Sequence, residues 1–347
     1  MTRMLIAALL ALALSGCGGD PDDGPREITV AGTGAPNTAG ETQWLTFRDR
    51  VHESGDDFRL RMLVYGQVGP EEQIISGLRR GRIHIANLSA LVVSTVLPEL
   101  AILYAPYLFE DYDEADFVFD HYLTDHVRTL LAEEGMHLIT WYEIGFHHVY
   151  GKRPLRVPSA ADGVRFRVSS SPASQVFARA IGADLIPLGF SAIVPSLQTN
   201  LIAAGENAVS LYARTGIAGE APHLILTGHA FGVSVIVARK DWWDGLDPAA
   251  QDMFTRAYPD IAASRAAVRE ETYDDLAGAE ALGIQVHRLT DDERRQWVEA
   301  TRVTHEQLID RLGGRTAELY ALIQEGRAAY RQAQRSGAAS SDARSRR

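Results

Sequence analysis

The first part of the sequence alternates between short strand-like runs and helical segments, and this alternation constrains the fold more than any other feature. Polar and apolar residues alternate in Arg59–Val64, and Glu27–Ala31 and Ile83–Ala86 are short apolar-rich runs, so all three predict strands. Between them, Thr42–Ser54 and Glu71–Arg80 have helical spacing. Strands that alternate with helices pair in parallel, so we expect an α/β architecture.

The same alternation returns in the second half of the chain. We predict strands at Val164–Val168 and Asp184–Pro187, with helices at Ala173–Ile181 and Ile193–Leu197. Val233–Ala238 has the strongest strand signal of the sequence. Two α/β series in one chain indicate two lobes, and ligands of such proteins bind between the lobes.

The C-terminal part is predicted to be mostly helical. Pro248–Leu282 and Asp291–Leu312 read as long helical stretches, separated by a short strand at Gln285–Leu289. The low-complexity residues 331–347 are expected to be disordered. A chain of 347 residues suits two domains. We expect lobe I to comprise residues 27–144 and 233–272, and lobe II to comprise 145–232 and 273–330.

The N-terminus predicts export. Arg3 precedes the apolar run Met4–Leu14, and small residues precede Cys17; the run is too short for a stable membrane anchor. The ending Leu-Ser-Gly-Cys resembles a bacterial lipoprotein signal, which implies cleavage before Cys17 and lipidation of its sulfur. Residues 1–16 are then a signal peptide and 17–26 a flexible tether. We therefore expect an extracytoplasmic or periplasmic protein, held at the membrane through Cys17.

Two arginines in one predicted strand raise the question of an anion site. Arg165 and Arg167 alternate with apolar neighbours, so both side chains lie on the same face. The net charge of −11 argues against general nucleic-acid binding, and any anion needs a local positive site. Arg167 stands at the carboxyl end of the strand, where clefts form, so we assign Arg167 to the cleft and Arg165 to the surface.

Several segments, taken together, resemble the solute-binding subunit of tripartite ATP-independent periplasmic (TRAP) transporters of the DctP-like family. They are GQVGPEEQIISGLRRGRIHIA, LPELAILYAPYLFEDYDEAD, ADGVRFRV, IGADLIPLGFSAIVPSLQTN and GEN. The resemblance implies a two-lobed periplasmic binding protein fold (type II-like), with mixed sheets and a long inter-lobe helix. It also implies that the protein captures a carboxylate-bearing organic acid and delivers it to a sodium-coupled membrane permease. The family's main anchor falls on Arg167, whose planar guanidinium matches both carboxylate oxygens.

The resemblance assigns further cleft positions. Asn207 matches an asparagine that bonds the solute, although a structural cap is an alternative reading. Phe190 matches an aromatic wall of the pocket, and Ser89 a polar position that varies with the solute. Tyr212 lies just beyond Asn207 and could supply a lid or a hydroxyl. Phe190 and Tyr212 could equally be core aromatics.

One departure from the family pattern concerns charge. His147 stands where many members carry a second arginine, so we expect a monocarboxylate with hydroxyl or aromatic character over a C4-dicarboxylate. His147 and His148 point to opposite faces of a strand, so they do not readily share a metal ion, and we expect no metal site. Glu206 is expected to be structural, because a pocket carboxylate would repel an anion.

The sequence contains none of the common catalytic motifs. There is no Gly-x-Ser-x-Gly elbow, P-loop, HExxH or dinucleotide fingerprint, and the glycine-rich stretch GTGAPNTAG has the wrong spacing for a phosphate loop. We therefore expect a monomeric binding protein without a cofactor, and not an enzyme. The alternative function is the ligand-binding component of a membrane sensor.

Overall fold

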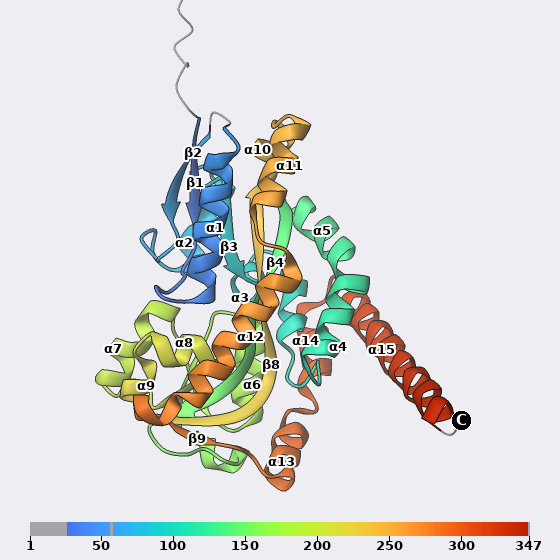
Figure 1. Cartoon of the computed structure of the whole chain (residues 1–347). Coiled ribbons are helices and arrows are strands. Elements are labelled where there is room, and N and C mark those ends of the chain that lie inside the picture. Colours follow the sequence, from blue (N-terminus) through green and yellow to red (C-terminus); the bar gives the residue numbers. More distant parts are fainter. Residues whose placement is uncertain (1–25, 56–57, 346–347) are drawn as a thin grey trace, which may run out of the picture.

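The computed structural model describes residues 26–55 and 58–345, with side chains as far as residue 336, and joins nine strands of these residues into one sheet (Figure 1). The strand order is β2-β1-β3-β8-β4-β7-β5-β6, and β9 pairs with β8. The signal peptide, Cys17 and all but the last residue of the tether lie outside the described residues. The strands are β1 (Arg26–Ala31), β2 (Phe58–Leu63), β3 (Ile85–Ser89), β4 (Met136–Gly151), β5 (Arg165–Val168), β6 (Asp184–Pro187), β7 (Ala204–Ala208), β8 (His223–Arg239) and β9 (Gln285–His287).

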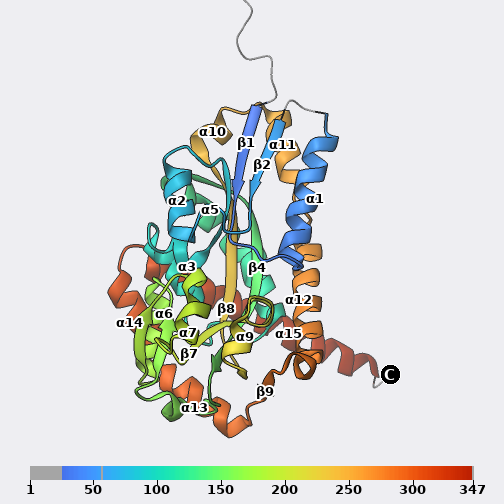
Figure 2. The same ribbon diagram turned by 90° about the vertical axis from the view of Figure 1, so that its left-hand side faces the viewer.

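The sheet is parallel at its two ends and antiparallel in its middle. β1 pairs in parallel with β2 and β3, and β5 pairs in parallel with β6 and β7. Between these groups, β4 and β8 run antiparallel over 16 and 17 residues and pass through both lobes (Figure 2). The predicted mixed pairing is confirmed, and the two lobes share one continuous sheet because these two strands belong to both.

Lobe I packs helices on both faces of β1–β3. Trp44, Phe47 and Phe254 form an aromatic core on one face, and the apolar side of α2, including Ile74 and Leu78, packs on the other. The first face is covered by α1 (Ala39–Glu53) and α11 (Pro248–Ala257), and the second by α2 (Glu71–Arg79), α3 (Ala90–Val93), η1 (Pro98–Tyr104), α4 (Tyr112–Val118), η2 (Phe119–Leu123) and α5 (Thr124–Glu133).

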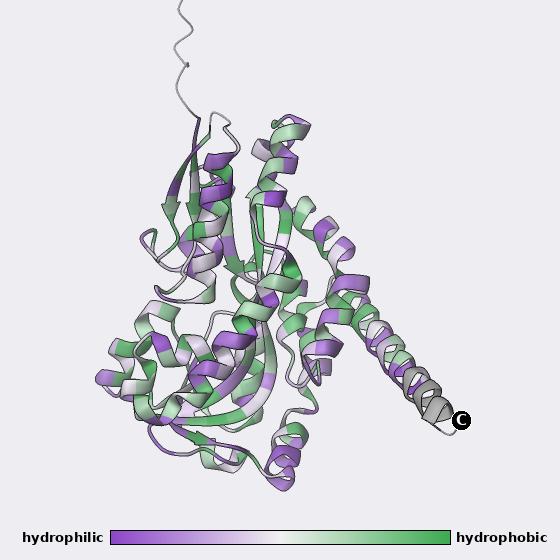
Figure 3. Cartoon of the chain, viewed as in Figure 1, coloured by the Kyte–Doolittle hydropathy of each residue, from purple (hydrophilic) through white to green (hydrophobic). Residues whose placement is uncertain are grey.

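Lobe II repeats this arrangement around β5–β7. Phe166 and Phe177 lie in the core on one face, and Ile193, Leu197 and Ile202 lie in the core on the other. In Figure 3 the strands consist mostly of hydrophobic residues, whereas the helices around them carry both hydrophobic and hydrophilic residues. The helical segments of this lobe are η3 (Pro158–Ala161), α6 (Pro172–Ala180), η4 (Phe190–Ala192), α7 (Ile193–Gln198), α8 (Val209–Arg214), α9 (Ile217–Glu220), η5 (Ala279–Leu282) and α13 (Asp291–Thr301).

Helix α12 (Ile261–Ala277), which follows α10 (Lys240–Asp244) and α11, runs alongside both lobes (Figure 1). In lobe I, Ser264 Oγ donates to Gln43 Oε1 of α1 at 2.7 Å. In lobe II, the guanidinium of Arg214 on α8 bonds the carboxylate of Asp275 at 2.8 Å. The predicted long inter-lobe helix is therefore present, tied to each lobe by side-chain contacts.

The C-terminal helices differ from the expected assignment. α15 (Thr316–Ser345) packs on lobe I: Leu319 and Ile323 enter its core, and Arg327 pairs with Glu114 of α4 at 3.1 Å. α14 (Thr304–Leu312) packs against both α6 of lobe II and η1 of lobe I. Residues 316–330 therefore lie against lobe I, where lobe II was predicted. α15 continues to Ser345, into the stretch 331–347 that was predicted to be disordered. Within residues 26–55 and 58–345, no helix combines the length and apolar character needed to cross a membrane.

Candidate functional site

The side chain of Arg167 is buried at the carboxyl end of β5. It is 7% exposed, and its Nε donates to the carbonyl oxygen of Leu188 at 3.0 Å. Arg165, two residues earlier on the same strand, is exposed. The prediction that the strand end separates these two arginines is consistent with their burial.

Arg167 forms no ion pair with any residue that the structure describes. Arg265, which is equally buried, shows the usual arrangement: it pairs with Asp116 at 3.1 Å and with Asp120 at 2.7 Å. A buried cation without a partner is costly, because no opposite charge replaces the water that it has lost. The guanidinium of Arg167 is therefore the group of the cleft best prepared to receive an anion.

Glu71, on α2 of lobe I, lies within electrostatic reach of Arg167. Burial raises the pKa of the Glu71 carboxyl, while the hydrogen bonds from Ser89 and the charge of Arg167 lower it. Both carboxylate oxygens accept hydrogen bonds of 2.7 Å, one from the backbone nitrogen of Ser89 and one from its Oγ. Sequence reasoning did not single out Glu71, because an acid in the first turn of a helix is common.

Ser89 is engaged by the fold. Its Oγ donates to Glu71 and also caps α3 by accepting a hydrogen bond from the backbone nitrogen of Val92 at 3.2 Å. A hydroxyl has one proton to donate, and here Glu71 takes it. The fold explains Ser89 without a solute.

Asn207 and Glu206 are neighbours on β7, so their side chains lie on opposite faces of the sheet. Asn207 is 4% exposed and its Oδ1 accepts a hydrogen bond from the backbone nitrogen of Ala208 at 3.0 Å. Its side-chain nitrogen makes no hydrogen bond to the residues that the structure describes. Asn207 thus caps its own strand with the oxygen and keeps the nitrogen available as a donor.

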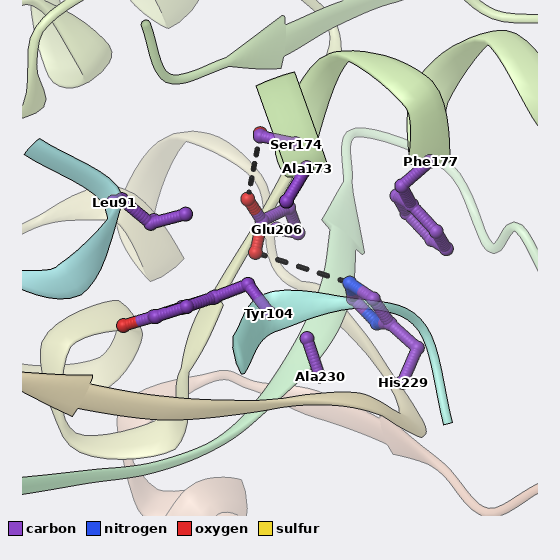
Figure 4. Close-up of a pocket in the computed structure, with 8 residues that line it drawn as sticks. All are labelled: Leu91, Tyr104, Ala173, Ser174, Phe177, Glu206, His229 and Ala230. Carbon is purple, nitrogen blue, oxygen red and sulfur yellow. Dashed lines mark hydrogen bonds and ion pairs between the residues drawn. The ribbon is translucent and has the colours of Figure 1, made fainter. Parts of the chain in front are cut away.

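Glu206 is the centre of a buried polar cluster (Figure 4). Ser174 Oγ donates to its Oε1 at 3.0 Å, His229 Nε2 lies 3.9 Å from its Oε2, and His147 Nδ1 bonds the same oxygen. Burial raises the pKa of Glu206, but His147, His229 and Arg167 outweigh burial and lower it to about 2. The cluster supports the sequence interpretation of Glu206 as a structural residue.

His147 belongs to this cluster. On the antiparallel pair β4–β7, His147 stands opposite Ala208, so it shares a face with Glu206 and not with Asn207. Its ring packs edge-on against Tyr104, with centroids 5.4 Å apart, and its buried Nε2 has no hydrogen-bond partner among the described residues. The structure thus joins His147 to a carboxylate, and does not bring it onto one face with Asn207.

The two aromatic candidates have different surroundings. Phe190 is half-buried in η4, beside Gly189, whose substitution would bring a Cβ within 3.7 Å of Pro70 in lobe I. Tyr212 is fully buried, and its hydroxyl donates to the carbonyl oxygen of Ala221 at 2.7 Å. Phe190 therefore stands at the boundary between the lobes, and Tyr212 is a core residue of lobe II.

The two lobes touch directly beside the strand of Arg167. Ser171 Oγ in lobe II lies 3.1 Å from Ser94 Oγ in lobe I, and Ser170 Oγ donates to Glu72 Oε1 of α2 at 3.0 Å. Both serines lie within three residues of the end of β5. The cleft at Arg167 is closed in this structure.

Two cavities flank the sheet. The small one in Figure 4 lies beside Glu206 and has room for about one water molecule. The other offers water about 210 Å³ and is lined by residues of α4, β4, α12 and α13, including Tyr112, Phe146 and Arg294. Arg167 lines neither of these two cavities. No group of three or more potential metal ligands lies together in the part of the chain that the structure describes.

The sequence and the fold of this chain match known proteins of one family. Residues 30–311 match the model of the bacterial extracellular solute-binding proteins, family 7, also called DctP. The chain is 25% identical over 257 residues to the 2,3-diketo-L-gulonate-binding periplasmic protein YiaO of Escherichia coli, which covers 73% of this chain and 78% of that protein. It is 23% identical over 306 residues to the C4-dicarboxylate-binding periplasmic protein DctP of Vibrio cholerae, covering 86% of this chain and 91% of that one.

A solved structure shows the same fold. The sugar acid binding protein DctPAm of Advenella mimigardefordensis, in complex with galactonate, superposes with a TM-score of 0.81 at 24% identity, over 87% of this chain and 99% of that one. The predicted two-lobed binding-protein fold is therefore confirmed. Since the family model matches most of the sequence, this chain belongs to the bacterial extracellular solute-binding proteins of family 7.

Proposed function

We propose that this protein is the extracytoplasmic receptor of a TRAP transporter, which captures a carboxylate-bearing organic acid and passes it to a sodium-coupled membrane permease. The observation that carries the proposal is the buried guanidinium of Arg167, which has no carboxylate partner among the described residues. A solute carboxylate would supply the missing charge and accept paired hydrogen bonds from the fork. The protein binds and releases its solute, and we propose no catalysis.

We propose that closure of the lobes buries the solute. Lobe I (residues 27–144 and 233–272, with 316–330) and lobe II (residues 145–232 and 273–303) then move relative to each other about β4, β8 and α12, with α14 packed between them. Hinge closure around a ligand is common in proteins built from two lobes. The contacts of Ser170 and Ser171 with lobe I would form on closure and open on release.

The charges around Arg167 favour a monocarboxylate. The family's second arginine is replaced by His147, which is bonded to Glu206, and Glu71 is within electrostatic reach of Arg167. A second solute carboxylate would find acidic neighbours and no second unpaired cation. YiaO, named for a keto sugar acid, and DctPAm, bound to galactonate, show that one-carboxylate solutes occur among the relatives. Asn207 and Phe190 would read the rest of the solute, whereas the fold already engages Ser89 and Tyr212.

A thermal-shift panel tests the solute class. D-Galactonate, an aromatic acid such as benzoate, and succinate are each added at the same excess to the purified protein. We expect a sugar or aromatic acid to raise the melting temperature by about 3–6 °C, because a ligand at 100 times its Kd adds about 2.7 kcal/mol. Stabilisation by succinate alone would contradict the monocarboxylate preference, and no shift with any acid would contradict the carboxylate receptor itself.

We further propose that the mature protein is a monomer tethered to the membrane by a lipid on Cys17. The support is the sequence before that cysteine, together with the lack of a described helix able to span a membrane. Cys17→Ser should leave the protein unlipidated and shift it from the membrane fraction to the soluble periplasmic fraction. Mass spectrometry of the N-terminus and fractionation measure this outcome, and membrane retention of the serine variant would exclude the anchor.

A further inference from the structure

Tyr150 on β4 carries a hydroxyl that the fold does not use. Its side chain is fully buried, and its oxygen has no hydrogen-bond partner among the residues that the structure describes. Two other buried tyrosines have acceptors: Tyr212 donates to the carbonyl oxygen of Ala221, and Tyr104 donates to the carbonyl oxygen of Val233 at 3.1 Å. An unpaired buried hydroxyl costs free energy, and phenylalanine would fill nearly the same space. The hydroxyl of Tyr150 therefore needs a partner.

The sheet register brings Tyr150 toward Arg167. Tyr150 on β4 stands opposite Gly205 on β7, and Phe166 on β5 stands beside Ala204 on β7. Arg167 follows Phe166, so it is the neighbour of Gly205 on β5, just as Tyr150 is its neighbour on β4. Tyr150, Gly205 and Arg167 therefore share one face of the sheet.

Gly205 makes this approach possible. A Cβ at this position would lie within 2.6 Å of Cζ of Tyr150, so the tyrosine ring occupies the space where any other residue would place its side chain. The ring of Tyr150 extends from β4 over β7. The next strand beyond β7 is β5, which carries Arg167. A glycine on β7 thus leaves room for the tyrosine ring beside the arginine.

Electrostatics agree with this placement. Burial raises the pKa of the Tyr150 hydroxyl, and among the charged groups around it Arg167 lowers that pKa while Glu206 raises it. Among the described residues Arg167 has one side-chain hydrogen bond, from Nε to the carbonyl oxygen of Leu188, so its terminal nitrogens have no described partner and can bind an anion. A free O–H donor and a free guanidinium, both buried, therefore lie on one face within electrostatic reach of each other.

We propose that the hydroxyl of Tyr150 is a second binding group for the solute carboxylate: it donates to one carboxylate oxygen, while Arg167 holds the carboxylate through its terminal nitrogens. This inference rests on the proposed function, because it needs a carboxylate at Arg167. The proposal explains why the Tyr150 hydroxyl has no partner in the fold and why a glycine, Gly205, stands opposite Tyr150. Tyr150 thereby becomes a binding residue, which no sequence motif marks.

The test compares Tyr150→Phe with Tyr212→Phe by calorimetric titration. The probes are D-galactonate, D-glucuronate and succinate, and the acid that binds the wild type best is used for the variants. We expect Tyr150→Phe to weaken binding about tenfold, the effect of one hydrogen bond to a charged group. The melting temperature of the solute-free Tyr150→Phe protein should not fall, since its hydroxyl bonds nothing in the fold.

Tyr212→Phe is the matched control, because it removes the hydroxyl of the stacked neighbour. The two rings lie 5.7 Å apart, and the Tyr212 hydroxyl has a protein acceptor. Tyr212→Phe should lower the melting temperature and leave the Kd within about twofold. A Kd of Tyr150→Phe within about twofold of the wild type would overturn the inference alone. Failure of all three acids to bind the wild type, or undiminished binding by Arg167→Ala, would overturn the proposed function and this inference with it.

Discussion

Arg167→Ala should abolish the thermal stabilisation produced by the solute acid and weaken its binding at least about 100-fold. The estimate follows from two hydrogen bonds between a guanidinium and a carboxylate, each of about 1.5–3 kcal/mol. A loss of binding can be attributed to the missing side chain, because we expect the Arg167→Ala protein to fold. Arg167 forms no ion pair with a described residue, so its removal breaks none, and the buried carboxyls of Glu71 and Glu206 lose only a longer-range charge interaction.

Arg165→Ala is the matched control, since it removes the same side chain two residues earlier on the same strand. Arg165 is exposed, and its change should alter the Kd by less than about twofold. Arg167→Lys should fall between the two variants, because an ammonium keeps the charge but loses the planar fork. Calorimetric titration and melting curves with and without the acid measure all three. Equal losses from Arg165→Ala and Arg167→Ala would show that the strand end does not separate the two arginines.

Helices and strands were predictable from the sequence where the local hydrophobic pattern matches the burial of the segment in the folded protein. The first strands and helices, through α2, match their predicted ranges within a few residues, and so do β5, α6 and β6. Each of these segments has one face in a core and the other toward solvent or a neighbouring layer. That arrangement imposes a periodicity that a single sequence displays.

The central strands were harder to predict. β8 extends from His223 to Arg239, but its β-branched residues are concentrated in Val233–Ala238. β7, with the sequence Ala-Gly-Glu-Asn-Ala, contains no strong strand former and is a strand because β4 and β5 flank it. The strand conformation of such segments is set by pairing with strands distant in the sequence, and a local sequence pattern carries no information about that pairing.

The residues in and around the proposed site divide in the same way. Arg167 could be assigned from its place at the end of a strand and from the family motif, because both are local signals. Tyr150 and Glu71 could not, since the role of each depends on neighbours distant in sequence: Gly205 for the tyrosine, and Ser89 for the glutamate. His147 shows the reverse case, in which a position is found by resemblance while its actual partner, Glu206, is set by the register of β4 and β7.

The buried histidines should make the protein sensitive to acid. His229 is 2% exposed, stacks on Phe177 with ring centroids 3.9 Å apart, and bonds Thr227 Oγ1 at 2.8 Å. Burial, with a smaller effect of His147, lowers the pKa of His229 to about 3 despite the opposing effect of Glu206. Burial likewise lowers the pKa of His148 to about 3, helped by the two other histidines.

The sign of the effect follows from proton binding. Both histidines have a folded-state pKa below the unfolded value of about 6.5, so the unfolded chain binds more protons between pH 6.5 and pH 3. The free energy of unfolding should therefore fall as the pH falls through this window, by about 1 kcal/mol per histidine between pH 6 and pH 5. Glu206, whose folded pKa is about 2, adds a further loss between about pH 4.5 and pH 2. The loss from neutral pH to pH 3 then approaches the whole stability of an ordinary domain.

Denaturant unfolding from pH 8 to pH 4 measures this prediction, with His229→Gln as the test variant. Glutamine can still bond Thr227 but cannot take up a proton. At pH 8 the variant should show only its packing cost, and between pH 6 and pH 5 it should lose about 1 kcal/mol less than the wild type. The value at pH 8 is thus an internal control for packing, and the difference in slope isolates the buried proton site. A variant whose stability falls in parallel with the wild type over this range would show that His229 takes up a proton in the folded protein as readily as in the unfolded chain.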